Sequence, residues 1–365
     1  MNLPSYKNLD IKSFQNLFSN KSESYKLFWF QAIVDKVHEG KSTLTYDEII
    51  NNMIADAWYM VAEYKLNLGP SDAIEHIVKR AFEISNLKSS EDREIIIDYI
   101  STCDDHIINS KKKVLTYNVP YRTQAPFMPN FKGAAWDGSA KSVAERINQA
   151  DNLIYSFGKI LGLSSEIIIK PDWYEYIYIN YEIIKGWIKY NLITYLQRRN
   201  PSVPGISLKL APPEERKLDK VKKYWKAVIS VTDIVDIYSG AILDNYDVSI
   251  DHFIPWSYVA HDELWNLCPT IKAVNSSKSN SLPDWDTYFE RLCHVEYKAY
   301  ETVHQYDQIK HLFSTCAKEH VNDPYILHKL YRDNISKNEF YYNLKEVVEP
   351  IYTSAKNMDF KIWTL

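Results

Sequence analysis

Hydrophobic side chains recur at intervals of three and four residues through the first 110 positions, which is the spacing of one face of an α-helix. The pattern predicts three helices, of which the third begins after Pro70 and Ser71. Glu91 and Asp92, which follow Ser90, are typical of the first turn of a fourth helix. The apolar positions of the first three helices are Leu27, Phe30, Val34 and Val37, then Ile50, Ile54, Ala57, Val61 and Tyr64, then Ile74, Ile77, Ala81 and Ile84.

The middle of the chain is less regular. Prolines and glycines between residues 111 and 136 indicate an irregular connection. Residues 173–199 predict one long helix that ends at Asn200, because a residue before proline, here Pro201, is pushed out of the helical region. Aromatic side chains alternate with basic ones in this helix, which fits either core packing or a platform on which bases stack. The basic residues are Lys185, Lys189, Arg198 and Arg199.

A further helix is predicted to begin at Pro212 and Pro213, because prolines are tolerated in a first turn and the acids Glu214 and Glu215 are favoured there. Its apolar stripe predicts one buried face, and basic residues crowd the other faces. The stripe is Leu218, Val221, Trp225 and Val228. The lysines for which we predict contacts with nucleic acid are Lys217, Lys220, Lys222, Lys223 and Lys226.

Residues 248–254 alternate in the manner of a β-strand. The alternation places His252 on the face of Val248, Ile250 and Ile254, whereas Asp251 points to the opposite face with Phe253. Turn-forming residues 244–247 (DNYD) separate this strand from the preceding AIL, which predicts a β-hairpin between the two.

A loop and a short helix follow the predicted strand. The loop contains Trp265 and Asn266, and residues 270–281 can form the helix. On that helix Asn275 and Lys278 are three residues apart, so they face the same way. The predicted order is therefore hairpin, loop and helix, with polar side chains converging from both ends.

The residue types in this segment are those that hydrolysis of a phosphodiester requires. The reaction needs a base that deprotonates water and a Lewis acid for the charge on the phosphate and the leaving oxygen. Histidine is the natural base near neutral pH, so His252 is the candidate. Asp251 offers a carboxylate and Asn275 an amide oxygen, and such hard ligands suit Mg²⁺ or Mn²⁺ better than zinc.

Charge is distributed unevenly along the 365-residue chain. The net charge is −4, but residues 111–240 carry 20 Lys and Arg against 12 Asp and Glu, an excess of +8. Because binding to phosphate depends on local cations and counterion release, this segment can bind nucleic acid despite the acidic average. The alternative is a solvated basic face with no partner.

Composition predicts a soluble, helix-rich protein. The chain has 9 glycines but 28 tyrosines and 10 tryptophans, which favours helices that pack through many aromatic side chains. We see no signal peptide and no stretch of about 20 apolar residues, so we expect no membrane span. Its cysteines form no CxxC pair and suit a reducing cytoplasm. They are Cys103, Cys268, Cys293 and Cys316.

The motif around His252 resembles the HNH (ββα-metal) endonuclease family. Asp251-His252-Phe253-Ile254-Pro255 is followed by Asn266, Asn275 and Lys278, which lie 14, 23 and 26 residues after His252. This order is similar to the His-Asn-Asn version of the motif, with the spacing found in HNH domains of RNA-guided CRISPR effector nucleases. The resemblance covers residues 206–300.

The resemblance implies a role for each motif residue. His252 would be the general base, Asp251 and Asn275 would bind one Mg²⁺ or Mn²⁺, Asn266 would hold the loop and orient His252, and Lys278 would contact phosphate. Products would carry 5′-phosphate and 3′-hydroxyl ends. Many HNH domains also have cysteine pairs that bind a structural zinc. Asp236 and Ser239 stand in the places of one such pair here, so we expect no structural zinc and a hairpin held by aromatic packing instead.

These observations predict an α+β, mostly helical protein with a small ββα-metal nuclease domain in its C-terminal half. We expect a helical domain at residues 1–110, a helical and basic connecting region at 111–205, the nuclease at 206–300 and a helical tail at 301–365.

The predicted function is metal-dependent endonuclease activity, most readily on DNA. The helical regions would direct it or bind a protein partner, in microbial restriction or anti-phage defence. One alternative is a nucleic-acid-binding or scaffold subunit of a complex that no longer cuts. The other is a nuclease that acts on RNA.

Overall fold

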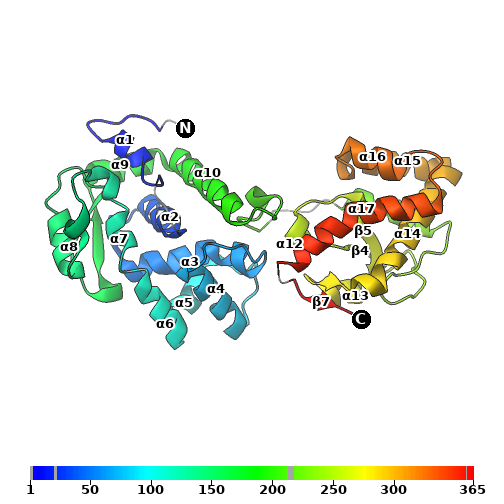
Figure 1. The fold of residues 1–365 in the computed structure, drawn as a ribbon, viewed down its shortest axis with the longest axis horizontal. Coiled ribbons are helices and arrows are strands. Elements are labelled where there is room, and N and C mark those ends of the chain that lie inside the picture. The colour runs from blue at the N-terminus through cyan, green and yellow to red at the C-terminus, as the bar shows by residue number, and fades with distance from the viewer. Residues whose placement is uncertain (1–2, 20–22, 213–217, 359) are drawn as a thin grey trace. The chain divides into compact units, whose positions relative to one another are not determined.

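A computed structural model describes residues 3–19, 23–212, 218–358 and 360–365. These residues form two compact units (Figure 1). Unit 1 consists of residues 1–201 and 209–212, and unit 2 of residues 202–208 and 213–365. The predicted segments 1–110 and 111–205 thus lie almost entirely in unit 1, and 206–300 and 301–365 almost entirely in unit 2. No helix among the described residues is long and apolar enough to cross a membrane.

Unit 1 is built from helices around an apolar core. The four helices predicted for its first part are present as α2, α3, α4 and α5. Three of them begin at a side-chain cap, since Thr45, Asp72 and Asp92 accept hydrogen bonds from backbone N–H groups of the first turn. The bounds are α1 Ile11–Gln15, α2 Tyr25–His38, α3 Tyr46–Ala62, α4 Ala73–Ile84, α5 Arg93–Thr102, α6 His106–Val114, α7 Val119–Arg122 and α8 Ala140–Ile147.

A three-stranded antiparallel sheet and two further helices complete unit 1. The sheet has the order β1-β3-β2, with β1 Thr43–Thr45, β2 Tyr155–Phe157 and β3 Glu166–Ile169. The single helix predicted over residues 173–199 is wrong, because the chain forms α9 (Pro171–Ile179) and α10 (Tyr181–Arg199). The break lies at Asn180, whose side-chain amide donates to the carbonyl of Tyr176 and ends the first helix.

Unit 2 contains a two-stranded antiparallel sheet of β4 (Val248–His252) and β5 (Leu267–Ile271), followed by α13 (Lys272–Lys278). Helix α13 is the short helix that the sequence predicted over residues 270–281. The expected pairing of the strand with the preceding AIL is wrong. Ile242 instead forms an isolated bridge with Val235, and β4 pairs with β5 across the loop that contains Asn266.

The remaining elements of unit 2 surround this sheet (Figure 1). Helix α11 packs its predicted stripe inward, and Val221, Trp225 and Val228 are fully buried. Its predicted start at Pro212 to Glu215 falls mostly outside the described residues. The bounds are α11 Asp219–Ile229, α12 Trp256–Val259, β6 Leu282–Pro283, α14 Trp285–Gln305, α15 Asp307–His320, α16 Pro324–Tyr331, α17 Lys337–Lys356 and β7 Ile362–Trp363.

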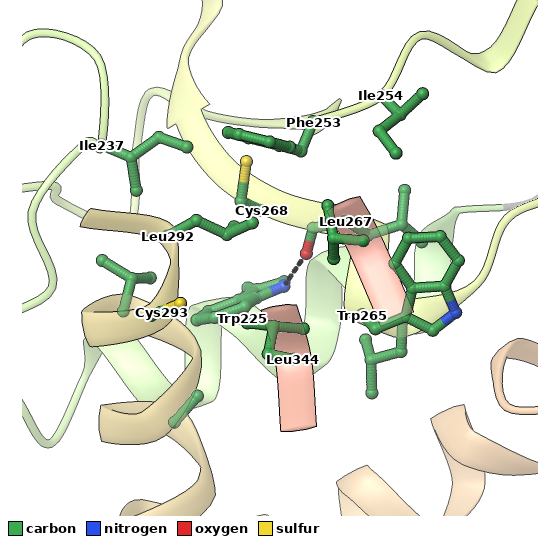
Figure 2. Close-up of a cluster of buried hydrophobic side chains, with 14 of the residues drawn as sticks. Trp225, Ile237, Phe253, Ile254, Trp265, Leu267, Cys268, Leu292, Cys293 and Leu344 are labelled. Atoms are coloured by element: carbon green, nitrogen blue, oxygen red, sulfur yellow. Dashed lines mark hydrogen bonds between the residues drawn. The ribbon is translucent and has the colours of Figure 1, made fainter. Parts of the chain in front are cut away.

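One hydrophobic core joins the sheet to the C-terminal helices. Figure 2 shows Trp225 of α11 beneath β5, where its indole N–H donates a 3.0 Å hydrogen bond to the carbonyl of Leu267. Leu292 of α14 and Leu344 of α17 belong to the same cluster. The prediction of a mostly helical α+β protein with a small β–β–α element in its C-terminal half is therefore confirmed.

Candidate functional site

Strand β4 carries two neighbouring polar residues at its end. Asp251 lies opposite Cys268 of β5, and His252 lies opposite Leu267. Both are buried, with only 5% of each residue exposed. Buried polar groups need partners in proteins, so their surroundings indicate what each can do.

The imidazole of His252 contacts a carboxylate. His252 Nε2 lies 2.7 Å from Asp262 Oδ1, in the loop that joins β4 to β5. An ionised carboxylate can only accept hydrogen bonds, so beside an ionised Asp262 the proton of this contact belongs to Nε2. Sequence reasoning missed Asp262, although an acid ten residues after His252 in the expected loop was a usable signal.

Asn266 fastens the same loop to the end of β4. Its Oδ1 accepts a 2.8 Å hydrogen bond from the backbone N–H of Ile254, and its Nδ2 donates a 2.8 Å bond to the carbonyl of that residue. The backbone N–H of Phe253 donates to the carbonyl of Asn266. Asn266 is fully buried, so it acts through these bonds and keeps the backbone after His252 in place.

The C-terminal helices hold the other side of this loop. His320, at the end of α15, has its Nδ1 2.7 Å from the backbone carbonyl of Asp262. The side-chain amide of Asn322 donates a 2.7 Å bond to Glu263. The side chain of Asp262 therefore contacts His252, and its backbone carbonyl contacts His320 at the end of α15. The sequence offered no signal for this contact, since His320 matched no motif spacing.

Asp251 is fixed by two donors. The hydroxyl of Tyr238 donates a 2.6 Å hydrogen bond to Asp251 Oδ2, and Lys278 Nζ lies 3.0 Å from the same oxygen. Burial, with the neighbouring charge of Asp251, raises the pKa of Tyr238 well above its ordinary value. The phenol therefore keeps its proton and remains a donor at neutral pH.

Lys278 lies inside the domain. Its side chain is 0% exposed, and Nζ donates a 2.8 Å hydrogen bond to the carbonyl of His252 in addition to its ion pair with Asp251. The sequence predicted a contact between this lysine and phosphate. In the structure the last turn of α13 directs the ammonium towards β4, so that it joins helix to strand instead of reaching solvent.

Asn275, one turn earlier on α13, faces the middle of β4. Its Nδ2 donates to Ser249 Oγ at 2.8 Å and to the carbonyl of Ile250 at 3.0 Å. These bonds fix the amide, and Asn275 Oδ1 has no hydrogen bond among the described residues. The amide nitrogen is thus held against the strand residue that precedes Asp251, and the amide oxygen is available to a ligand.

The carboxylate of Asp251 and the amide oxygen of Asn275 fit a hard divalent cation. Among the described residues no group of three or more His, Cys, Asp or Glu side chains could hold a metal ion. Two protein oxygens are nevertheless enough for Mg²⁺, which usually keeps several waters and binds through one or two side chains plus substrate phosphate. In this structure both carboxylate oxygens of Asp251 contact Lys278 Nζ, at 3.2 and 3.0 Å, so the ligand pair of Asp251 and Asn275 stays a prediction.

The comparison with known families agrees with this arrangement of strand, loop, strand and helix. Residues 236–284 match the HNH endonuclease family. The chain thus carries an HNH endonuclease domain in its C-terminal half, which indicates nuclease activity of the HNH type. No curated protein and no solved structure matches the chain. Helices α14 to α17 lie after the matched HNH segment, yet they share its core.

The start of the HNH segment is held by a carboxylate where other HNH domains have a cysteine pair. Asp236 Oδ2 accepts hydrogen bonds from Thr270 Oγ1 at 2.9 Å and from the backbone N–H of Ile271 at 3.1 Å. Its Oδ1 accepts from the backbone N–H of Tyr238 at 2.9 Å. Fully buried Asp236 therefore links this turn to the end of β5, a role that sequence reasoning did not assign to it.

The predicted lysines of α11 lie on the solvent side of the HNH domain. Lys222 and Lys223 are exposed, Lys226 is half-buried, and Lys220 pairs with Glu319 of α15. Lys217 lies outside the described residues. The apolar face of α11 packs against β4 and β5, so its lysines point away from the strand that carries His252.

Proposed function

We propose that the HNH domain is an endonuclease that hydrolyses phosphodiester bonds in DNA with one Mg²⁺ or Mn²⁺ ion. The observation that carries the proposal is the 2.7 Å contact between His252 Nε2 and Asp262 Oδ1, at the end of the strand that also carries Asp251 and contacts Asn275 through the carbonyl of Ile250. A positioned histidine beside two hard oxygen ligands supplies both the base and the Lewis acid that the reaction needs.

In the proposed mechanism the imidazole of His252 accepts a proton from the attacking water. The ring then becomes an imidazolium, and Asp262 stabilises its charge through Nε2 at 2.7 Å. Asn266 holds the backbone after His252 in place. His320, at the end of α15, holds the backbone of Asp262. Asp251 and Asn275 would hold the divalent ion, whose charge stabilises the negative charge that develops on phosphate.

The other parts of the chain would deliver the substrate. We propose that Lys217, Lys220, Lys222, Lys223 and Lys226 contact the phosphate backbone, which positions nucleic acid without reading its sequence. Helical unit 1 would then supply targeting or bind a protein partner. A cytoplasmic role in restriction or anti-phage defence fits a nuclease of this kind.

The first test is a set of parallel digests with the purified full-length chain and Mg²⁺. Single- and double-stranded DNA and RNA of one sequence are incubated side by side, and the new ends are labelled to identify 5′-phosphates. We expect cleavage of DNA that leaves 5′-phosphate ends. Cleavage confined to RNA would reject the DNA assignment, and cleavage of none of the four would favour a scaffold subunit.

Replacing Asp262 by asparagine is expected to lower kcat for plasmid nicking by about 10- to 100-fold, because the variant keeps the imidazole and loses part of the roughly 10²- to 10⁴-fold that a positioned base contributes. The amide keeps the size of the carboxylate but not its charge, so the imidazolium loses stabilisation. Asp286→Asn, at an exposed position of α14, is the matched control. Equal rates for the two variants would remove Asp262 from the mechanism.

His320→Ala is expected to lower kcat roughly tenfold, as for other residues that orient a catalytic group. The variant loses the hydrogen bond to the carbonyl of Asp262, which releases the loop opposite His252. Affinity for uncleaved DNA, measured by gel shift with Ca²⁺, should not change. His311→Ala, on an exposed face of the same helix, is the control. A loss of affinity with unchanged kcat would contradict the positioning role.

A further inference from the structure

Unit 1 contains a cavity of about 500 Å³ that the nuclease site does not use. It is lined by α2, α3, α5, α10 and residues 210–212. Its volume lies within the range of pockets that bind small molecules, roughly 300–1,000 Å³. Apolar and aromatic side chains line part of the cavity, and charged side chains line the rest.

A buried carboxylate with one unused oxygen lines this cavity. Only 6% of the Asp56 side chain is exposed. Asp56 Oδ1 accepts a 3.0 Å hydrogen bond from Arg93 Nε, but Asp56 Oδ2 is buried without a hydrogen-bond partner among the described residues. Burial raises the pKa of Asp56, and the charge of Asp35 adds to this effect. The Arg93 guanidinium opposes this shift, and Asp56 Oδ2 still lacks a hydrogen-bond donor among the described residues.

The wall next to Asp56 contains two aromatic rings, those of His38 and Tyr181, and a second carboxylate, that of Asp35. His38 stacks on Tyr181, with ring centroids 3.9 Å apart. Asp35 accepts hydrogen bonds from the hydroxyl of Tyr181 at 3.0 Å and from Lys185 at 2.8 and 2.9 Å. Lys185 Nζ also lies 5.9 Å from the centre of the Tyr181 ring, so the rings of this wall offer apolar contact area to a ligand and already have their own cation.

The charge balance of the lining decides the class of ligand. Two cations, Arg93 and Lys185, line the cavity, and both are already paired with its aspartates. The lining acids are Asp35, Glu39, Asp56 and Glu91, of which Glu39 pairs with Lys36. Glu91 is thus the lining acid without an ion pair among the described residues. An anion would meet this carboxylate, whereas a cation with N–H donors would balance its charge and satisfy Asp56 Oδ2.

We propose that this cavity binds a small organic cation with N–H donors, of the polyamine or guanidinium-amine class. One ammonium or guanidinium group donates to Asp56 Oδ2, and the alkyl chain lies along the Tyr181 wall. The site is separate from the HNH domain, so the proposal does not depend on nuclease activity.

Isothermal titration of the full-length chain with spermidine and with agmatine tests the proposal. We expect saturable one-site binding of at least one of them and none of AMP, an anion of similar size. Asp56→Asn should weaken binding at least tenfold, since it removes the charge next to the donor. Glu91→Gln, at the half-exposed part of the lining, should weaken it severalfold and serves if Asp56→Asn does not fold.

Glu83→Gln is the control for nonspecific attraction of cations to acidic side chains, because Glu83 is an exposed acid of unit 1 outside the cavity. It should leave the affinity unchanged. The proposal is overturned if neither amine binds, if AMP binds, or if Glu83→Gln weakens binding as much as the cavity variants do. Tighter binding of a lysine-containing hexapeptide than of either amine would also overturn it in favour of a protein ligand.

Discussion

His252→Ala is expected to reduce the rate of DNA cleavage by about 10²- to 10⁴-fold, the range that a positioned general base contributes. The substitution removes the imidazole of β4, which directly follows Asp251 on that strand. It also leaves Asp262 without its contact at Nε2. The measurement is the initial rate of nicking of a supercoiled plasmid under single-turnover conditions, where product release does not limit the rate.

His311→Ala is the matched control, since this exposed histidine of unit 2 has no part in the site. It should nick at the wild-type rate. Thermal unfolding of His252→Ala followed by circular dichroism shows whether the domain still folds. A folded His252→Ala variant that cuts as fast as His311→Ala would remove His252 from the role of base.

Lys278→Met is expected to destabilise unit 2 by about 3–5 kcal/mol, the cost of removing one partner of a buried ion pair. The variant leaves Asp251 buried with Tyr238 as its remaining donor, and it removes the bond to the carbonyl of His252. The unfolding midpoint should fall by about 6–20 °C for a unit of this size. Differential scanning calorimetry of the full-length chain measures this shift.

Lys272→Met is the control for the loss of a lysine from α13, because Lys272 is exposed at the start of that helix. Its unfolding midpoint should stay close to wild type. The pair of variants also separates the two roles of Lys278. A contact with phosphate predicts weaker DNA binding with unchanged stability, and that result would contradict the internal ion pair as the main role.

The first helices and the elements that carry the motif residues could be predicted from the sequence, because both depend on local patterns. Spacings of three and four residues located α2, α3 and α4. The intervals from His252 to Asn266 and Asn275 placed the site on a strand, a loop and a helix. Each of these signals lies within a short stretch of chain.

What the sequence did not reveal depends on contacts between distant segments. The partner of β4 is decided by the register with β5 and not by the nearest turn. The burial of Lys278 follows from the direction of the last turn of α13, which residue spacing does not show. The support of Asp262 by His320 joins residues 58 positions apart, and no pattern in one sequence connects them.

The dependence of cleavage on divalent metal ions shows whether the HNH domain is a metal-dependent nuclease. The purified full-length chain, first treated with EDTA, is incubated with supercoiled plasmid while Mg²⁺ or Mn²⁺ is raised from zero. We predict no nicking without metal, a saturable rise with either ion, and a requirement for more metal in Asn275→Ala. Nicking that persists in EDTA, or an Asn275→Ala variant with the wild-type metal dependence, would contradict the account of the HNH site.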